Sequence, residues 1–140
     1  MGVKKLVLPV DILENLIRDA KTLGRKEEIA GVFLGKIDGE TAIVVESRRG
    51  ENILHDKSSF LMDPEQFYEF LVKGEKKGLE LVGVWHTHLG DPNPSIIDVK
   101  TMMMWPVVWV IFDAITGIFT ASKYDVETEK IVSVEVELRK

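Results

Sequence analysis

Apolar residues recur along this chain with two periods, and each period predicts one kind of element. Helical spacing with one apolar face runs from Val10 to Gly24 and again from Pro64 to about Lys77. A short helix is predicted over 95–105, where Pro106 ends it. Segments that are continuously apolar, or in which apolar and polar residues alternate, predict strands. The main predicted strands span residues 4–8, 29–37, 41–47, 79–88, 107–112, 118–124 and 131–138. A further short strand is predicted over 60–62.

The order of these segments predicts an α/β (α+β mixed) fold. Asp38-Gly39 is typical of a hairpin turn, so the strands on either side of it should pair antiparallel. Hairpins dominate the order, which favours a mixed, largely antiparallel sheet flanked by helices. The strand 79–88 is apolar almost to its end and should lie centrally, whereas residues 48–59 should form a polar loop. We expect a single domain over residues 1–140.

Composition narrows the classes of function. With 140 residues, 45% hydrophobic and 29% charged, the chain has enough apolar sequence to bury a core. A net charge of −5 argues against a general nucleic-acid binder. The longest apolar run, 102–112, is too short for a membrane span, and the apolar stretch within residues 1–9 is too short for a secretory signal. We therefore expect a cytoplasmic protein with no membrane partner.

Candidate metal ligands lie where the central strand ends. His86 and His88 are two residues apart on a strand, so both imidazoles should leave the same face. The following loop carries Gly90 and two prolines and leads to a helix start, with Asp98 in its first turn. The chain has no cysteine, so a metal here must be held by histidines and carboxylates. Two imidazoles and one carboxylate form the kind of three-ligand set that catalytic zinc uses.

Asp98 has a competing structural explanation. Ser95-Ile96-Ile97-Asp98 is also a capping-box pattern, with a hydroxyl at the N-cap and a carboxylate three residues later. We expect Asp98 to serve only one of these tasks well, and the nearby histidine pair favours the metal. Asp91 is the rival carboxylate, but Gly90-Asp91-Pro92 is typical of a turn.

A hydrolytic zinc site also needs a base, and two glutamates enter the strand 29–37. Glu28 should share a face with Ala30 and Val32, and Glu27 should share the other face with Ile29 and Gly31. Alternation alone leaves open which face meets the metal. Glutamates at this position of a strand more commonly face solvent.

Taken together, these residues resemble the signature of the JAMM (MPN+) metalloprotease family over residues 3–125. The matching positions are a glutamate three residues before a glycine (Glu28, Gly31), then His86 and His88, then Ser95 and Asp98. Two departures stand out. Leu89 replaces the proline that usually follows the second histidine, and the loop to Ser95 is one residue shorter than usual. We expect the loop to compensate for this change.

The resemblance implies a cytidine-deaminase-like fold holding one zinc ion on His86, His88 and Asp98. It implies that Glu28 is the general base and that Ser95 hydrogen-bonds the oxyanion. It also implies an isopeptidase or peptidase that cleaves at the C-terminal tail of a ubiquitin-like or sulfur-carrier-type protein, a deubiquitinase-like metalloprotease.

Three alternatives stay open at this point. The chain could be a catalytically inactive MPN-type scaffold, an iron enzyme with a two-histidine, one-carboxylate site, or a RadC-like protein acting near DNA. His55 should be a solvated histidine outside the site, or else touch the substrate tail. Met102, Met103, Met104 and Trp105 should be mostly core, with any excess available for a homodimer contact.

Overall fold

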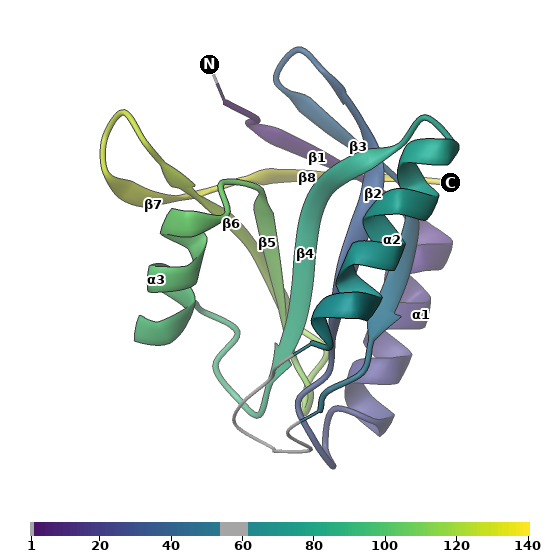
Figure 1. Ribbon diagram of the computed structural model, residues 1–140. Helices are drawn as coiled ribbons and strands as arrows, with labels where there is room; N and C mark the ends of the chain where they lie inside the picture. The colour runs from purple at the N-terminus through teal and green to yellow at the C-terminus, as the bar shows by residue number, and fades with distance from the viewer. Residues whose placement is uncertain (1, 54–61) are drawn as a thin grey trace.

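Strands form one curled sheet in the order β7-β6-β5-β4-β2-β3-β1-β8 (Figure 1). The computed structural model describes residues 2–53 and 62–140. Four pairings are antiparallel (β2/β3, β2/β4, β5/β6, β6/β7) and three are parallel (β1/β3, β1/β8, β4/β5), which confirms a mixed, largely antiparallel sheet. The strands are β1 (Lys5–Pro9), β2 (Ala30–Asp38), β3 (Thr41–Gly50), β4 (Glu80–His88), β5 (Val108–Asp113), β6 (Phe119–Asp125), β7 (Lys130–Ser133) and β8 (Glu135–Arg139).

Helices cover both faces of the sheet (Figure 1). Leu13 of α1 (Val10–Thr22) joins a buried cluster with Phe33 of β2. Phe67 of α2 (Pro64–Lys76) packs against a second cluster that contains Val32 of β2. Because successive residues of a strand point to opposite faces, α1 and α2 lie on opposite sides of β2. The third helix among the described residues, α3 (Ile96–Met104), contacts β6.

The central strands β2 and β4 position the candidate functional residues. β2 and β4 pair with each other and each has a further neighbour, so the prediction of a central position for residues 79–88 is confirmed. β4 pairs in parallel with β5 up to its last residue, where His88 lies opposite Asp113. The end of β4 is therefore supported by β5 up to His88, whereas its register with β2 ends at His86.

One predicted strand is two strands. The segment 131–138 breaks at the buried Val134, whose N–H donates to the carbonyl of Ala121. β7 stays beside β6, whereas β8 crosses to the opposite edge of the strand order and pairs in parallel with β1. Consecutive strands can occupy opposite edges only if the sheet curls until those edges approach each other. Such a long-range closure leaves no mark in local periodicity.

The predicted loop over 48–59 was wrong at its start, because β3 continues through Arg48 and Arg49 to Gly50. These residues pair with Val32, Gly31 and Ala30 of β2. Backbone pairing with a central strand maintains β3 here although its arginines are polar. Residues 54–61, which include His55 and most of the predicted strand 60–62, lie outside the described residues; Met62 forms an antiparallel bridge with Asn52.

None of the helices within residues 2–53 and 62–140 combines the length and the apolar character that a bilayer crossing requires.

Candidate metal centre

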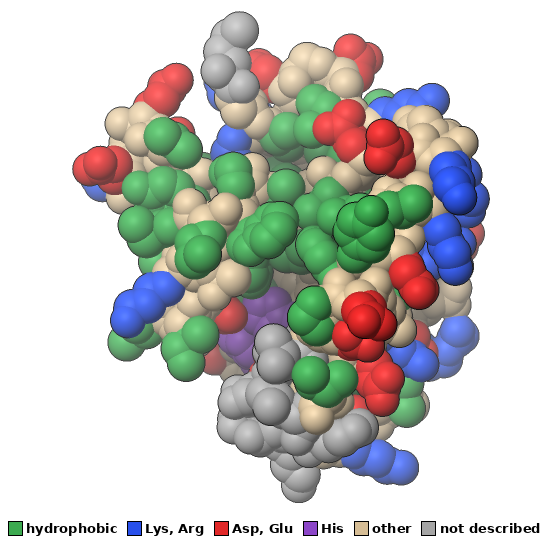
Figure 2. Space-filling view, in the orientation of Figure 1, with side chains coloured by type: hydrophobic (Ala, Val, Ile, Leu, Met, Phe, Trp, Pro, Cys, Tyr) green, Lys and Arg blue, Asp and Glu red, His purple; other side chains and the backbone are tan. Residues whose placement is uncertain are grey.

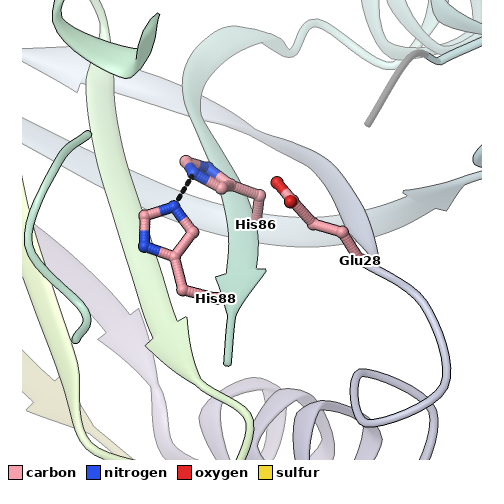
Figure 3. Close-up of side chains that lie close together, drawn as sticks. All are labelled: Glu28, His86 and His88. Atoms are coloured by element: carbon pink, nitrogen blue, oxygen red, sulfur yellow. Dashed lines mark hydrogen bonds between the residues drawn. The ribbon is translucent and has the colours of Figure 1, made fainter. Parts of the chain in front are cut away.

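The end of β4 brings two imidazoles together. His86 and His88 leave the same face of the strand, and their Nε2 atoms lie 3.2 Å apart (Figure 3). His86 is buried and its ring meets the ring of Trp109 edge to face, with centroids 5.7 Å apart. Nδ1 of His88 lies 3.0 Å from the carbonyl oxygen of Asp91, which fits an Nδ1–H donor and leaves Nε2 facing the site.

Asp98 reaches both rings from the first turn of α3. Its Oδ1 lies 3.1 Å from Nε2 of His86, and its Oδ2 lies 3.1 Å from Nε2 of His88. The one-residue-shorter loop therefore leaves the carboxylate within reach of both histidines. The two imidazole Nε2 atoms lie 3.2 Å apart, and each lies 3.1 Å from a different oxygen of the Asp98 carboxylate. These distances are close to the roughly 3.3 Å edge of a tetrahedron with ligand distances near 2.0–2.1 Å. This donor set fits a zinc ion.

The same carboxylate also caps α3, the structural role that was weighed against metal ligation. The N–H of Ser95 donates to Asp98 Oδ2 over 2.8 Å, and the N–H of Asp98 donates to Ser95 Oγ over 3.1 Å. A carboxylate oxygen accepts more than one bond, so capping and ligation are compatible. Ser95 Oγ accepts in this box, so its hydroxyl hydrogen is available for a second partner.

Electrostatics in the cluster favour a cation. Burial alone would raise the pKa of Asp98, but the hydrogen bonds from His86 and His88 outweigh it and hold that pKa far below its usual range. The pKa of His88 is raised, chiefly by its hydrogen bond to Asp98 and with a smaller contribution from the charge of Glu28. The lowered pKa keeps the Asp98 carboxylate negatively charged, and the raised pKa of His88 reflects the attraction of the nearby carboxylates for positive charge.

Glu28 faces this cluster from the chain just before β2 (Figure 3). It is buried, and one of its carboxylate oxygens lies within 4.8 Å of ring nitrogens of His86 and His88. Glu27 turns the other way and lines a separate small pocket near Arg49. The structure thus settles the question that alternation left open: Glu28, and not Glu27, is on the face of the histidines.

The Asp91 side chain stabilises the turn that follows His88. Its Oδ1 accepts hydrogen bonds from the backbone N–H and the side-chain amide of Asn93, at 3.0 and 2.7 Å. The interpretation of Gly90-Asp91-Pro92 as a turn is confirmed, and the carboxylate that meets both histidines is that of Asp98.

Close packing explains why a glycine occupies position 31. A β-carbon added there would lie 2.2 Å from the carbonyl oxygen of Arg48 and 2.6 Å from the ring of Trp85. The indole of Trp85 lies against β2 and donates to the hydroxyl of Ser47 over 3.0 Å. The glycine therefore lets three central strands approach one another next to the site.

An apolar cleft of about 820 Å³ opens from the histidines between α2 and α3. Figure 2 shows green side chains around this hollow, with the purple histidines at its lower end. Phe67 and Trp105 meet edge to face at 5.6 Å. Glu28, Ser95 and Asp98 also line the cleft, together with Val32, Met62, Val84, Leu89, Ile97 and Trp109.

The expectation that residues 102–105 are mostly core was wrong. Met102 is fully buried, but Met103, Met104 and Trp105 are 53%, 77% and 44% exposed. Ile96 and Ile97 at the start of α3 are exposed as well. A single short helix at the rim of the sheet can bury only one of its faces, so its apolar content exceeds the core that is available to it.

A buried carboxylate that sequence reasoning missed supports the loop after His88. Asp113, at the end of β5, accepts from the N–H of Gly90 at 3.0 Å and of Ile115 at 2.8 Å, and from the hydroxyl of Thr116 at 2.8 Å. Thr120 of β6 donates to the carbonyl of Pro92 over 2.7 Å. The sequence did contain a signal for this role of Asp113: it is an acidic residue at the end of an apolar strand.

Asp113→Ala should lower the free energy of unfolding at neutral pH by about 2–3 kcal/mol, because several hydrogen bonds to a charged group are lost. Burial would raise the pKa of Asp113, but these bonds, led by that of Ile115, lower it. A lowered folded pKa contributes stability above the unfolded pKa of about 3.9 that is lost as the pH falls. Urea unfolding should therefore show a constant gap between wild type and variant from pH 7 to about pH 4 and a narrowing gap below about pH 4. A gap that does not narrow below about pH 4 would contradict this.

The chain belongs to the prokaryotic JAB family of JAMM-type proteins. The family described as "Prokaryotic homologs of the JAB domain" matches residues 9–125. A desampylase of Pyrococcus furiosus is 32% identical over 107 residues, which cover 76% of this chain and 72% of that protein. A desampylase of Haloferax volcanii is 26% identical over 142 residues, 98% of this chain and 100% of that protein. The identification as a JAMM-type isopeptidase hydrolase made from the sequence is confirmed.

The fold agrees with a solved structure. The solution structure of a protein from Desulfitobacterium hafniense superposes with a TM-score of 0.83, covering 96% of this chain and 93% of that one at 19% identity. At this identity the likeness concerns the fold.

Proposed function

We propose that this chain is a zinc-dependent isopeptidase that cleaves at the C-terminal tail of a ubiquitin-like or sulfur-carrier-type protein. The observation that carries the proposal is the convergence of His86, His88 and Asp98 within 3.2 Å, with Glu28 beside them. The desampylase names of the two relatives support a protein conjugate as substrate. One zinc ion per chain is expected, and the chain is expected to act in the cytoplasm without nucleic-acid or membrane partners.

Each residue has a distinct part in the proposed reaction. His86, His88 and Asp98 would hold the zinc ion, which would supply Lewis acidity and acidify the attacking water. Glu28 would accept a proton from that water and return it to the leaving lysine amine. The Ser95 hydroxyl donates to the developing oxyanion, next to the positive end of α3. The aromatic and aliphatic walls of the cleft exclude water around these groups.

The apolar cleft is the proposed path of the tail. A modifier tail ending in two glycines is extended and narrow, so it can lie along a groove that ends at the metal centre. The walls from α2 and α3 would contact side chains upstream of the glycines. A homodimer through the exposed apolar residues of α3 stays a prediction.

Chelation provides the direct test. The purified protein should contain about one zinc ion per chain and should cleave at least one member of a panel of ubiquitin-like and sulfur-carrier conjugates. Dialysis against a chelator should remove both the metal and the activity, and added zinc should restore them. Full activity of metal-free protein would contradict the proposal; metal-free protein without activity on any conjugate would instead favour an inactive scaffold.

Ser95→Ala should lower kcat by roughly 10²–10³-fold, the usual effect of losing an oxyanion donor. The change also removes a helix cap, which costs about 1 kcal/mol in stability. Asp63→Ala is the matched control, because Asp63 caps α2 through the N–H of Glu65. The control should lose stability and keep kcat. Equal kcat values for the two variants would reduce Ser95 to a helix cap.

A further inference from the structure

The peptide group that joins Glu28 to Ile29 is held from both ends by buried side chains. The side-chain amide of Asn52 donates to the carbonyl oxygen of Glu28 over 2.9 Å. On the other side of the same peptide group, the N–H of Ile29 donates to the hydroxyl of Thr87 over 3.1 Å. Asn52 is 2% exposed and Thr87 is 1% exposed, so water competes weakly for these bonds.

Thr87 also hydrogen-bonds the carbonyl oxygen of Ile29. Its backbone N–H donates to the carbonyl oxygen of Ile29 over 3.0 Å, and its hydroxyl lies 3.5 Å from the same oxygen. Thr87 stands between His86 and His88 in β4, so its side chain points to the face opposite the imidazoles. One strand therefore carries two proposed metal ligands on one face and the anchor of the segment bearing Glu28 on the other.

These side chains replace regular strand pairing where it ends. The paired residues of β2 begin at Ala30, opposite His86 of β4 and Gly50 of β3. Glu28 lies before that point. Asn52, two residues beyond the last residue of β3, and Thr87 of β4 together extend the support of β2 by one peptide group. The Glu28 carboxylate thus projects from backbone that is fixed against both neighbouring strands.

We propose that Asn52 and Thr87 are positioning residues that fix the Glu28 carboxylate at the distance from the metal centre that proton transfer requires. The inference rests on the proposed function, in which Glu28 is the general base. A carboxylate at the end of a flexible side chain magnifies any rotation of its own peptide group. A misplacement of about 1 Å in a catalytic group can cost roughly 10²-fold in rate, so both bonds should matter for kcat although neither residue touches the substrate.

Three substitutions distinguish a role in positioning Glu28 from a role in side-chain packing. Thr87→Val keeps the shape and loses the hydroxyl, whereas Thr87→Ser keeps the hydroxyl. Asn52→Asp keeps the shape but faces the Glu28 carbonyl with an acceptor in place of the amide donor. Val44→Ala, in the core part of β3, is the control for a general loss of stability.

The experiment combines kinetics with amide hydrogen exchange on the zinc-loaded protein. Thr87→Val and Asn52→Asp should lower kcat by roughly 10²-fold, with KM and zinc content unchanged and with the acid limb of the pH–kcat profile moved. Thr87→Ser should stay within about threefold of wild type, and Val44→Ala should keep kcat. Exchange of the Ile29 amide should accelerate at least about tenfold in Thr87→Val and stay slow in Thr87→Ser.

Two results would overturn the positioning role. The first is a wild-type kcat in Thr87→Val although its Ile29 amide exchanges faster. The second is an Ile29 amide that exchanges in Thr87→Val at the wild-type rate. A wild-type protein that cleaves no conjugate would count against the proposed function alone. Positioning is then decided by the ¹³C resonance of the Glu28 carboxylate, which should shift in Thr87→Val and Asn52→Asp and match wild type in Thr87→Ser. An unchanged resonance in all three variants overturns the inference.

Discussion

Replacing Glu28 by glutamine should lower kcat by roughly 10²–10⁴-fold, the usual share of a general acid or base, while one zinc ion per chain is retained. Glutamine has nearly the same shape but no basic oxygen that can accept and return a proton near neutral pH. The metal should stay because its proposed ligands, His86, His88 and Asp98, are unchanged. Turnover of a modifier conjugate and zinc analysis of the same sample are the two measurements.

Glu27→Gln is the matched control, since the two glutamates are adjacent but face different pockets. This variant should keep kcat and KM near the wild-type values. Retained turnover in Glu28→Gln would remove Glu28 as the base, and loss of zinc from that variant would instead mark Glu28 as a metal ligand.

Asp98→Ala should have the other large effect, a loss of zinc affinity greater than roughly 10²-fold and, with it, of activity. Removing a directly bound carboxylate should cost more than the 10–100-fold typical of residues that only orient the ligands. Because Asp98 also caps α3, Asp98→Asn is needed beside it: asparagine can still accept the N–H of Ser95 but brings no charge to the metal.

The control for this pair is Asp91→Asn, which keeps an acceptor for the turn and removes the rival carboxylate. It should bind one zinc ion per chain. Zinc stoichiometry by elemental analysis and affinity by competition with a chelating dye decide the assignment. An Asp98→Asn variant with wild-type zinc affinity would exclude Asp98 from the ligand set, whatever happens to activity.

The candidate site could be predicted because its pattern is local. Alternation along a strand places His86 and His88 on one face, and a capping box places Asp98 in the first turn of a helix; both follow from spacings of two or three residues. Local rules could not choose between Glu27 and Glu28, because the choice depends on which face of β2 lies on the side of the histidines and the cleft. That face is set by packing against Trp85 and the two clusters of the core.

The supports of the site escaped prediction for a related reason. Asn52 and Glu28 are 24 residues apart, and Thr87 and Ile29 are 58 apart. A single buried asparagine or threonine has no periodic signal, and its partner becomes visible only when strands are paired. The break at Val134 and the exposed methionines of α3 escaped for the same cause, since both depend on how the sheet closes and on how much core it offers.

The proposed double role of Asp98, as metal ligand and helix cap, would link metal binding to the shape of the cleft. The carboxylate that would complete the proposed donor set also caps the first turn of α3, and Ile97 and Thr101 of α3, with Trp105 just after it, supply one wall of the cleft. Any ion that binds the ordered helix start more tightly than the frayed one stabilises that wall by mass action. Zinc would then contribute twice, once to the chemistry and once to the affinity for the tail, so starvation of the metal should weaken capture as well as cleavage.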